Sequence, residues 1–348
     1  MVLNLGTNLP YVAARAKARR SNLADRSRLR QLLQQSNDQL AVAVADIGYR
    51  TEIDLYAGRL TGADLLETAL THNLETEMHD VLSLCAPKVQ RIVHHYTDRF
   101  TYHNAKVVLR AVANEVEDEK VRFSILPEEN PLHVPWLRIY ESAESLRHAV
   151  ELMKRLPFGK ALNDLEEDTR LPTYEDALDR HYFSSALSDL KGNSNVIRML
   201  RSYLRMEIDH RNLINLLEGW AMNINEDRML SSMIPGGEAL PTRLHGEIIR
   251  GGSSRLLDRL GDVHRFDAEG FKQAHDEATS ARTLDPIVTF LGAREHAAMA
   301  RMAYLQPVSA LPIIHYISAK VDEVQNLRLI VRGRLAGLST EVIEAHLF

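Results

Sequence analysis

Histidine and acidic side chains offer this chain its most direct route to chemistry, because together they can bind a divalent metal that activates water. The chain contains 15 histidines, and His72 precedes the pair His79-Asp80 by seven residues. A hydrolase of this kind gathers its His and Asp ligands from several helices, and an interval of seven residues is too short for that arrangement. A His-Asp pair also arises easily by chance. These residues therefore predict no metal site.

Other constellations that could carry chemistry are incomplete. Glu207 and His210 have the Glu-x-x-His spacing of a di-iron helical bundle, which requires the motif twice, and the chain contains it once. The adjacent pair His94-His95 points to different faces of a helix and does not suit a shared metal. Gly159-Lys160 lacks the upstream Gly and the following Ser or Thr of a phosphate-binding loop. The sequence thus predicts no catalytic, cofactor-binding or metal-binding residues.

The composition describes a folded protein without a nucleic-acid partner. Hydrophobic residues make up 45% of the 348 positions and charged residues 26%, which leaves enough apolar surface to bury a core. The formal net charge of −5 argues against nucleic-acid binding, which usually needs a basic excess. The single cysteine, Cys85, allows no internal disulfide and indicates a reducing compartment such as the cytoplasm. Its apolar neighbours predict a buried thiol.

We find neither a secretion signal nor a membrane span in the sequence. The first ten residues lack both a basic region and an apolar core. The longest apolar run, Leu40 to Ala45, has six residues, whereas a transmembrane helix needs roughly 20. We therefore expect any work at a membrane to proceed from its surface or through a partner.

Helical patterns extend from end to end and predict an all-α fold. The clearest lies near the C-terminus, where Gly337 suits a helix end and Ser339 a new helix start. Seven apolar residues form one stripe before that end: Ile313, Ile317, Val321, Val324, Leu327, Val331 and Leu335. The best strand candidate, 121–126, is short and isolated. Breaks at 115–135 and 233–241, with a smaller loop at Gly251-Gly252, divide the chain into thirds.

Each third contains an asparagine with similar flanking residues, which indicates an internal repeat. Asn104, Asn212 and Asn326 are separated by 108 and 114 residues. A small residue stands seven positions after each Asn, and an acid stands three before the second and third: Ala111, Gly219 and Gly333, with Asp209 and Glu323. The small residue would let another helix approach closely, and the Asn is interpreted as a satisfied polar group that holds local packing. The period predicts units at 1–118, 119–230 and 231–348.

Ordered stretches along nearly the whole chain resemble one protein family. They are Tyr11 to Arg19, Asp46 to Ile53, Leu66 to Glu75, His95 to Ala111, Asp209 to Leu213 and Leu311 to Ile343, the last with Lys320, Asn326-Leu-Arg, Arg332-Gly-Arg and Gly337-Leu-Ser. The set resembles the C subunits of A-type (archaeal and some bacterial V-type) ATP synthases, whose family also includes the d subunits of vacuolar ATPases. One departure is Thr101, where the family usually has an acid before the Asn.

The resemblance implies an all-α protein with three similar helical domains in a funnel around a pseudo-threefold axis. It implies a non-catalytic rotor subunit that binds no nucleotide and no cofactor. Its partners would be the central-stalk subunits, received in the central cavity, and the proteolipid ring in the membrane. Such a subunit transmits torque between ion flow and ATP synthesis or hydrolysis. It would lie at the cytoplasmic face of the membrane, as a peripheral part of a membrane complex.

Two alternatives belong to other classes. One is a free-standing helical-repeat scaffold for another partner, against which the terminal family landmarks argue. The other is a metal phosphohydrolase of the HD type built on His72, His79 and Asp80.

A basic stretch at 15–30 holds seven Lys or Arg against one acid, Asp25. It is interpreted as a solvated helix face, or as a surface that meets acidic loops of a partner or lipid headgroups.

Overall fold

Helices dominate the computed structural model, which describes residues 8–264 and 266–347. Within those residues no strand is present, so the predicted all-α fold is confirmed. None of the described helices is long and apolar enough to cross a lipid bilayer. The chain packs into two compact units. Unit 1 comprises the chain up to residue 97, residues 103–152 and the chain from 303 onwards, and unit 2 comprises 98–102 and 153–302.

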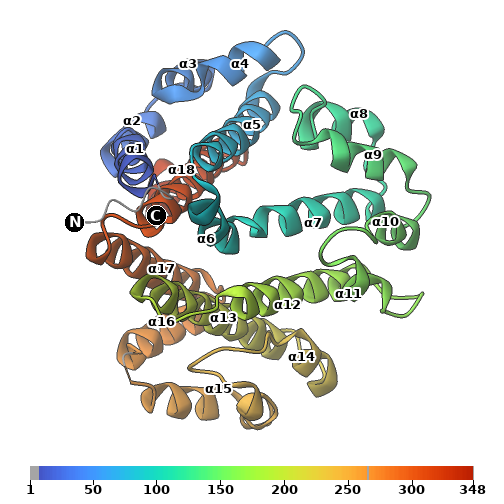
Figure 1. Cartoon of the computed structure of the whole chain (residues 1–348), viewed down its shortest axis with the longest axis vertical. Coiled ribbons are helices and arrows are strands. Elements are labelled where there is room, and N and C mark those ends of the chain that lie inside the picture. The colour runs from blue at the N-terminus through green and yellow to red at the C-terminus, as the bar shows by residue number, and fades with distance from the viewer. Residues whose placement is uncertain (1–7, 265, 348) are drawn as a thin grey trace. The chain divides into compact units, whose positions relative to one another are not determined.

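Unit 1 is organised around one long helix, α18 (Leu311–Leu335), which packs against α1, α2, α5 and α6. Figure 1 shows α18 beside α1 and α5. The other elements of unit 1 are α1 (Leu9–Ser21), α2 (Arg26–Leu33), α3 (Asn37–Val44), a π-helical turn (Ala45–Tyr49), α4 (Arg50–Tyr56), α5 (Gly62–Ser83), α6 (Pro87–Thr97), α8 (Asp118–Lys120), a second π-helical turn (Val121–Ile125), α9 (Val134–Ser142), α10 (Leu146–Leu152) and α19 (Thr340–Ala345).

The apolar pattern of α18 explains its central place in unit 1. Ile313 and Ile317 of the predicted stripe are fully buried, and so are Ile314 and Ile330 on other faces of the helix. A helix that is apolar on several faces is covered by neighbours on several sides. The predicted stripe is wrong at its end, because Leu335 lies in the last turn and is 76% exposed.

Unit 2 has an apolar core of its own. Leu213 and Leu216 from α13 (Asn195–Ala221), Ile248 from α15 (His245–Gly261) and Phe271 from α16 (Ala268–Ala281) belong to it. The remaining elements of unit 2 are α11 (Gly159–Asn163), α12 (Leu171–Asp189), α14 (Glu226–Ser232), a 3-10 turn (Thr242–Leu244) and most of α17 (Asp285–Leu305). Helix α7 (Arg99–Ala113) begins in unit 2 and continues in unit 1.

The structure answers two local questions that the sequence leaves open. The strand candidate at 121–126 forms the second π-helical turn, which continues α8. Its closing hydrogen bond runs from Leu126 N–H to Val121 O at 2.7 Å, across five residues. The expected break at Gly251-Gly252 is present as a kink within the bounds of α15, where Gly252 has non-helical backbone angles with φ +67°. Glycine adopts this left-handed conformation without a steric penalty, so it kinks the helix there.

The division into repeats at 1–118, 119–230 and 231–348 stays a prediction. Units 1 and 2 are defined by packing and not by internal repetition. Unit 1 combines segments from the first, second and last predicted repeats, because residues near both ends of the chain pack around α18.

A buried group of polar side chains fastens the N-terminal part of unit 1 to α18. The Glu323 carboxylate lies 2.8 Å from Lys320 Nζ and accepts hydrogen bonds from Ala24 N–H at 2.7 Å and from the Tyr49 hydroxyl at 2.6 Å. The Lys320 ammonium also lies 4.1 Å from the centroid of the Tyr49 ring. Burial and the Glu323 charge raise the pKa of Tyr49 well above its usual value, so its phenol remains a donor. Both charges are buried, so removal of either one would leave the other buried without a counter-charge.

We predict that Glu323→Gln lowers the free energy of unfolding by about 3 kcal/mol, because the Lys320 ammonium would be left buried without a counter-charge. Urea-induced unfolding followed by far-UV circular dichroism measures the loss. Glu128→Gln is the control, since Glu128 is exposed and its replacement should change the free energy by less than about 0.5 kcal/mol. Equal stability of the two variants would contradict the importance of the buried pair.

Candidate functional site

The three predicted repeats end their long helices, α7, α13 and α18, with the same backbone geometry. The carbonyl of the small residue accepts a hydrogen bond from the N–H five residues later, at 3.0 Å for Ala111, 2.8 Å for Gly219 and 2.9 Å for Gly333. The residue four positions after it has a positive φ: +49° at Glu115, +53° at Asn223 and +72° at Gly337. In each case the N–H of that residue bonds to the carbonyl three positions earlier. These bonds define a Schellman helix end.

A short helix starts directly after each of these ends. The residue ten positions after the small residue is apolar and buried in every case: Val121, Met229 and Ile343. A Cβ atom on Gly219 would lie 2.7 Å from Met229 Cε, and one on Gly333 would lie 2.8 Å from Ile343 Cγ1. This close approach gives the small residues of the second and third repeats their physical reason. We call the segments 111–121, 219–229 and 333–343 the first, second and third helix corners.

The acid and the asparagine of the second repeat hold the loop that follows α14. Asn212 is fully buried, donates from Nδ2 to Ile234 O and accepts from Ile234 N–H, both at 2.8 Å. Asp209 accepts three backbone hydrogen bonds, from residues 238–240, at 2.8 to 2.9 Å. Burial raises the pKa of Asp209, while these backbone donors favour its charged form. A Cβ atom on Gly237 would overlap Asp209 Oδ1, so the loop has no room for a larger residue there.

The third repeat uses the same positions with a different partner. Glu323 accepts from the N–H of Ala24, which lies 299 residues earlier in the chain, whereas Asp209 holds a loop about 30 residues later. Asn326 is buried in the same helix as Glu323. Asn104 of the first repeat is only half-buried in α7, in the repeat where Thr101 replaces the acid. The structure thus gives the repeated acid a loop-holding role in the second and third repeats.

Apolar side chains are exposed at two of the corners. At the second corner Met222 is 70% exposed, and Ile224 is exposed as well. At the third corner the exposed residues are Leu338 and Val342, next to Leu335. Apolar groups that gather on a surface mark contacts with other molecules more often than single ones do. The sequence shows only that these apolar residues lie where a helix ends. It does not show that their side chains are exposed.

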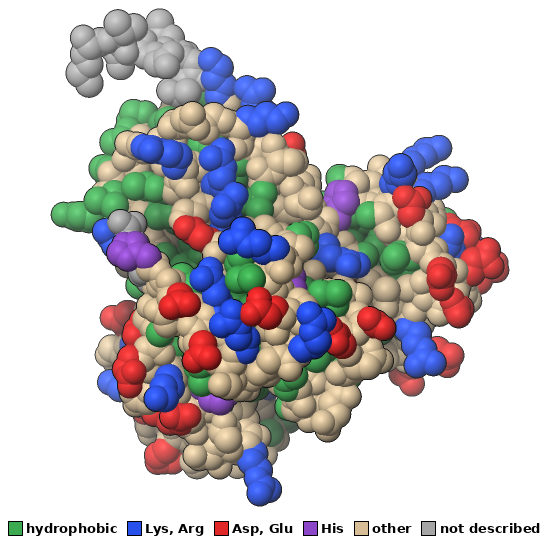
Figure 2. Space-filling model, turned by 90° about the horizontal axis from the view of Figure 1, so that it is seen from below, with side chains coloured by type: hydrophobic (Ala, Val, Ile, Leu, Met, Phe, Trp, Pro, Cys, Tyr) green, Lys and Arg blue, Asp and Glu red, His purple; other side chains and the backbone are tan. Residues whose placement is uncertain are grey.

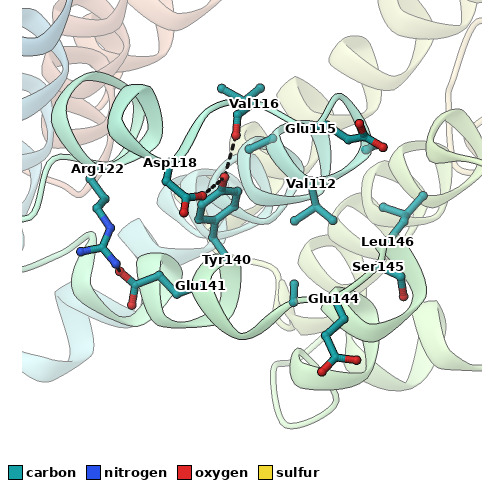
Figure 3. A pocket seen from close by; sticks show the side chains of 13 residues that line it. Val112, Glu115, Val116, Asp118, Arg122, Tyr140, Glu141, Glu144, Ser145 and Leu146 are labelled. Atoms are coloured by element: carbon teal, nitrogen blue, oxygen red, sulfur yellow. Dashed lines mark hydrogen bonds and ion pairs between the residues drawn. The ribbon is translucent and has the colours of Figure 1, made fainter.

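The first corner differs from the others, because a cavity of about 710 Å³ opens beside it. Acidic residues dominate the charged lining of this cavity: Glu115, Asp118, Glu141 and Glu144 against Arg122. Figure 3 shows the Tyr140 hydroxyl between Val116 O, at 2.7 Å, and Asp118 Oδ1, at 2.9 Å. Burial and the bond to Asp118 raise the pKa of Tyr140 to about 12. Arg122 pairs with Glu141 at 2.7 Å, which leaves the cavity with a net acidic lining.

The candidate metal residues make ordinary contacts between helices. His72 Nδ1 lies 2.8 Å from a tyrosine hydroxyl, and burial lowers the pKa of His72. Both oxygens of Glu207 are bound by the guanidinium of Arg99, at 2.8 and 2.9 Å, and His210 Nδ1 lies 2.7 Å from Glu295. In the described parts of the chain, no group of three or more His, Cys, Asp or Glu side chains is placed to hold a metal ion.

Cys85 is buried, as its sequence neighbours predict. Its Sγ lies 3.3 Å from Val81 O, and burial raises the pKa of the thiol to about 11. A thiol with a raised pKa carries little thiolate at neutral pH, so Cys85 is a poor nucleophile.

Charged side chains of both signs are exposed on the face of the molecule shown in Figure 2. Lys and Arg predominate in the upper part of this face, whereas both signs are interspersed over the rest of it.

Comparison with known proteins gives a consistent result. Residues 12–346 match the family described as ATP synthase (C/AC39) subunit. The A-type ATP synthase C subunit of Halorubrum lacusprofundi is 30% identical, over 98% of this chain and 97% of the relative. The C subunit of the Haloferax volcanii A-type ATP synthase is 29% identical over 98% of each chain, and that from Methanosarcina barkeri is 25% identical over 98% of this chain and 93% of its own.

We predict that Asn212→Ala lowers the free energy of unfolding by about 3 kcal/mol, because it leaves both backbone groups of Ile234 buried without a partner. Hydrogen exchange at the Ile234 amide should accelerate at the same time. Asn215→Ala is the matched control, one helical turn away, where a half-buried side chain makes a single bond to Ser232 O. The control should cost no more than about 1 kcal/mol. A loss in the control as large as in Asn212→Ala would contradict the assignment.

Proposed function

Because the chain belongs to the ATP synthase (C/AC39) subunit family, we propose that it joins the central stalk of an A-type ATP synthase to the proteolipid ring in the membrane. Members of this family are structural subunits of the complex and are not catalytic. As a part of the rotor, the protein transmits torque between ion flow and ATP synthesis or ATP-driven ion pumping. The observation that carries this proposal is similarity to the C subunits of A-type ATP synthases over nearly the full length of both chains.

The physical character of the molecule supports this role. A part that transmits torque must resist deformation, and densely packed helices have low compressibility. Loops that would otherwise yield are held by buried carboxylates, Asp209 in unit 2 and Glu323 in unit 1. Each of these side chains is nearly inaccessible to water, which leaves its hydrogen bonds without competition from solvent.

The arrangement that goes with this role is also proposed. The three repeats at 1–118, 119–230 and 231–348 would form similar helical domains around a pseudo-threefold axis, with a central cavity for the stalk. The shared geometry of the three helix corners supports an internal repeat. The protein would lie at the cytoplasmic face of the membrane, as a peripheral subunit of the complex.

The helix corners are the proposed contact surfaces for the partner subunits. At the second and third corners, apolar side chains stand in water in the isolated chain, and a partner that covers them gains the hydrophobic free energy of burial. The first corner offers instead a cavity with an acidic lining.

Capture of purified partners tests the proposed role directly. The tagged chain is incubated with the isolated central-stalk subunits, and separately with the detergent-solubilised proteolipid ring. We expect it to retain both. Retention of neither would overturn the rotor assignment and would favour a helical scaffold that serves another partner.

We predict that Leu335→Gln combined with Val342→Gln weakens capture of one of these partners at least about tenfold, which corresponds to about 1.4 kcal/mol. The reason is loss of apolar surface from the third corner, and the affinity is measured by titration. Val42→Gln combined with Leu55→Gln is the control, because both residues are exposed to a similar degree elsewhere in unit 1. If the control weakens capture equally, or if the corner variant changes nothing, the corner is not the contact.

A further inference from the structure

Five basic side chains of α1 and α2 form what we call the basic stripe. All five are exposed: Arg15, Lys17 and Arg20 on α1, and Arg26 and Arg28 on α2. The only acid of this segment is Asp25, and its carboxylate caps α2 by accepting the N–H of Arg28 at 2.8 Å. The segment therefore carries a net positive charge, although the whole chain has a net charge of −5.

Two further arginines of the segment are excluded from the stripe because they have acidic partners. Arg19 pairs with Glu77 at 2.5 Å, and Arg30 pairs with Glu344 at 2.6 Å. These pairs tie α1 to α5 and α2 to α19 within unit 1, and the other five cations of the segment make up the stripe.

The stripe follows the length of α18. Arg19 and Tyr316 share Glu77, the N–H of Ala24 reaches Glu323, and Leu32 O accepts from Arg334. Positions 19, 24 and 32 thus advance in the same direction as positions 316, 323 and 334. Because an α-helix rises 1.5 Å per residue, the supported segment extends over about 27 Å.

The exposed side of α1 combines these cations with an aromatic residue and small residues. Val12, Ala13 and Ala16 are buried, and the opposite side carries Tyr11, which is 54% exposed, and two exposed alanines, at 14 and 18. At helical spacing, Arg15 and Lys17 flank this weakly apolar centre. Tyrosine bordered by Lys and Arg is a combination enriched where proteins meet the bilayer–water interface.

We propose that the basic stripe binds the anionic headgroups of a lipid bilayer. Basic residues near a negatively charged leaflet each contribute attraction, and the five side chains can act together because one layer of headgroups offers charge along the whole stripe. An acidic protein segment would satisfy the charges too. A bilayer fits better here, because its headgroups offer negative charge along the whole segment of about 27 Å, and because the small exposed side chains Ala14 and Ala18 allow a close approach.

This inference goes beyond the proposed rotor role and does not depend on it. A chain that fails to bind lipid could still join the stalk to the ring, and one that binds lipid could still fail to do so. The capture of partner subunits and the binding of lipid vesicles are therefore separate tests, and either one can give a negative result without the other.

Co-sedimentation of the full chain with vesicles tests the proposal. We expect binding to vesicles of phosphatidylcholine mixed with phosphatidylglycerol, little binding to phosphatidylcholine alone, and weakening as salt is added. The triple variant Arg15→Gln, Lys17→Gln, Arg20→Gln should bind the anionic vesicles about 100-fold less tightly. The matched control is Lys88→Gln, Arg91→Gln, Lys120→Gln, three exposed cations outside the stripe, which should bind like the unmodified chain.

Unchanged circular dichroism and unfolding midpoints would show that the triple variant folds. Equal binding to both vesicle types, or equal loss in the two triple variants, would overturn the proposal. Polyglutamate immobilised on beads is the competing probe. If it retains the chain through the same three residues while anionic vesicles do not, the stripe recognises an acidic protein and the lipid assignment is wrong.

Discussion

Backbone groups buried between helices must find hydrogen-bond partners, and much of this fold follows from how the long helices supply them. Helix α13 uses Asp209 and Asn212 to hold five backbone groups of one loop. Helix α18 uses Glu323 for the backbone N–H of Ala24. A loop that is held in this way can lie close against its helix, and Met233, Ala239 and Leu240 of the loop after α14 pack into the same apolar core as α13.

The same constraint explains why unit 1 is built from segments far apart in the chain. In the second repeat the loop that Asp209 holds comes about 30 residues later. In the third repeat the N-terminal segment takes that place, and Glu323 holds it through Ala24. Tyr49 and Lys320 complete the group. These contacts tie the N-terminal helices to α18, and helices near a chain end are otherwise the first to fray.

Local features could be predicted from the sequence where local chemistry decides them. Gly337 ends α18 with a positive φ, and Ser339 caps α19 through the N–H of Val342, as their residue types indicate. The exposure of Leu335 could not be predicted, because periodicity does not show where the neighbouring helices stop. The π-helical turn at 121–125 could not be predicted either, since β-branched residues favour strands only when a sheet is available to pair with.

The repeat pattern singles out the small residues but does not tell what surrounds them. Spacing along one chain contains no record of which distant segment fills the space beside a side chain. The backbone partner of Glu323 lies 299 residues away, and the acidic cavity at the first corner is lined from α7, α8, α9 and α10, the second π-helical turn and the segments between them. Both features arise from tertiary contacts, and a single sequence does not show which distant residues come into contact.

The three corners show how one backbone design can present different surfaces. Each corner needs a left-handed residue at the same place, and Gly337 and Asn223 are well suited to it. Glu115 is not, since a left-handed conformation costs an ordinary residue about 1 to 2 kcal/mol. The first corner tolerates this cost and gains a carboxylate on the rim of its cavity, while the other corners keep apolar surfaces. One backbone geometry thus offers an acidic cavity rim at the first corner and apolar side chains at the second and third.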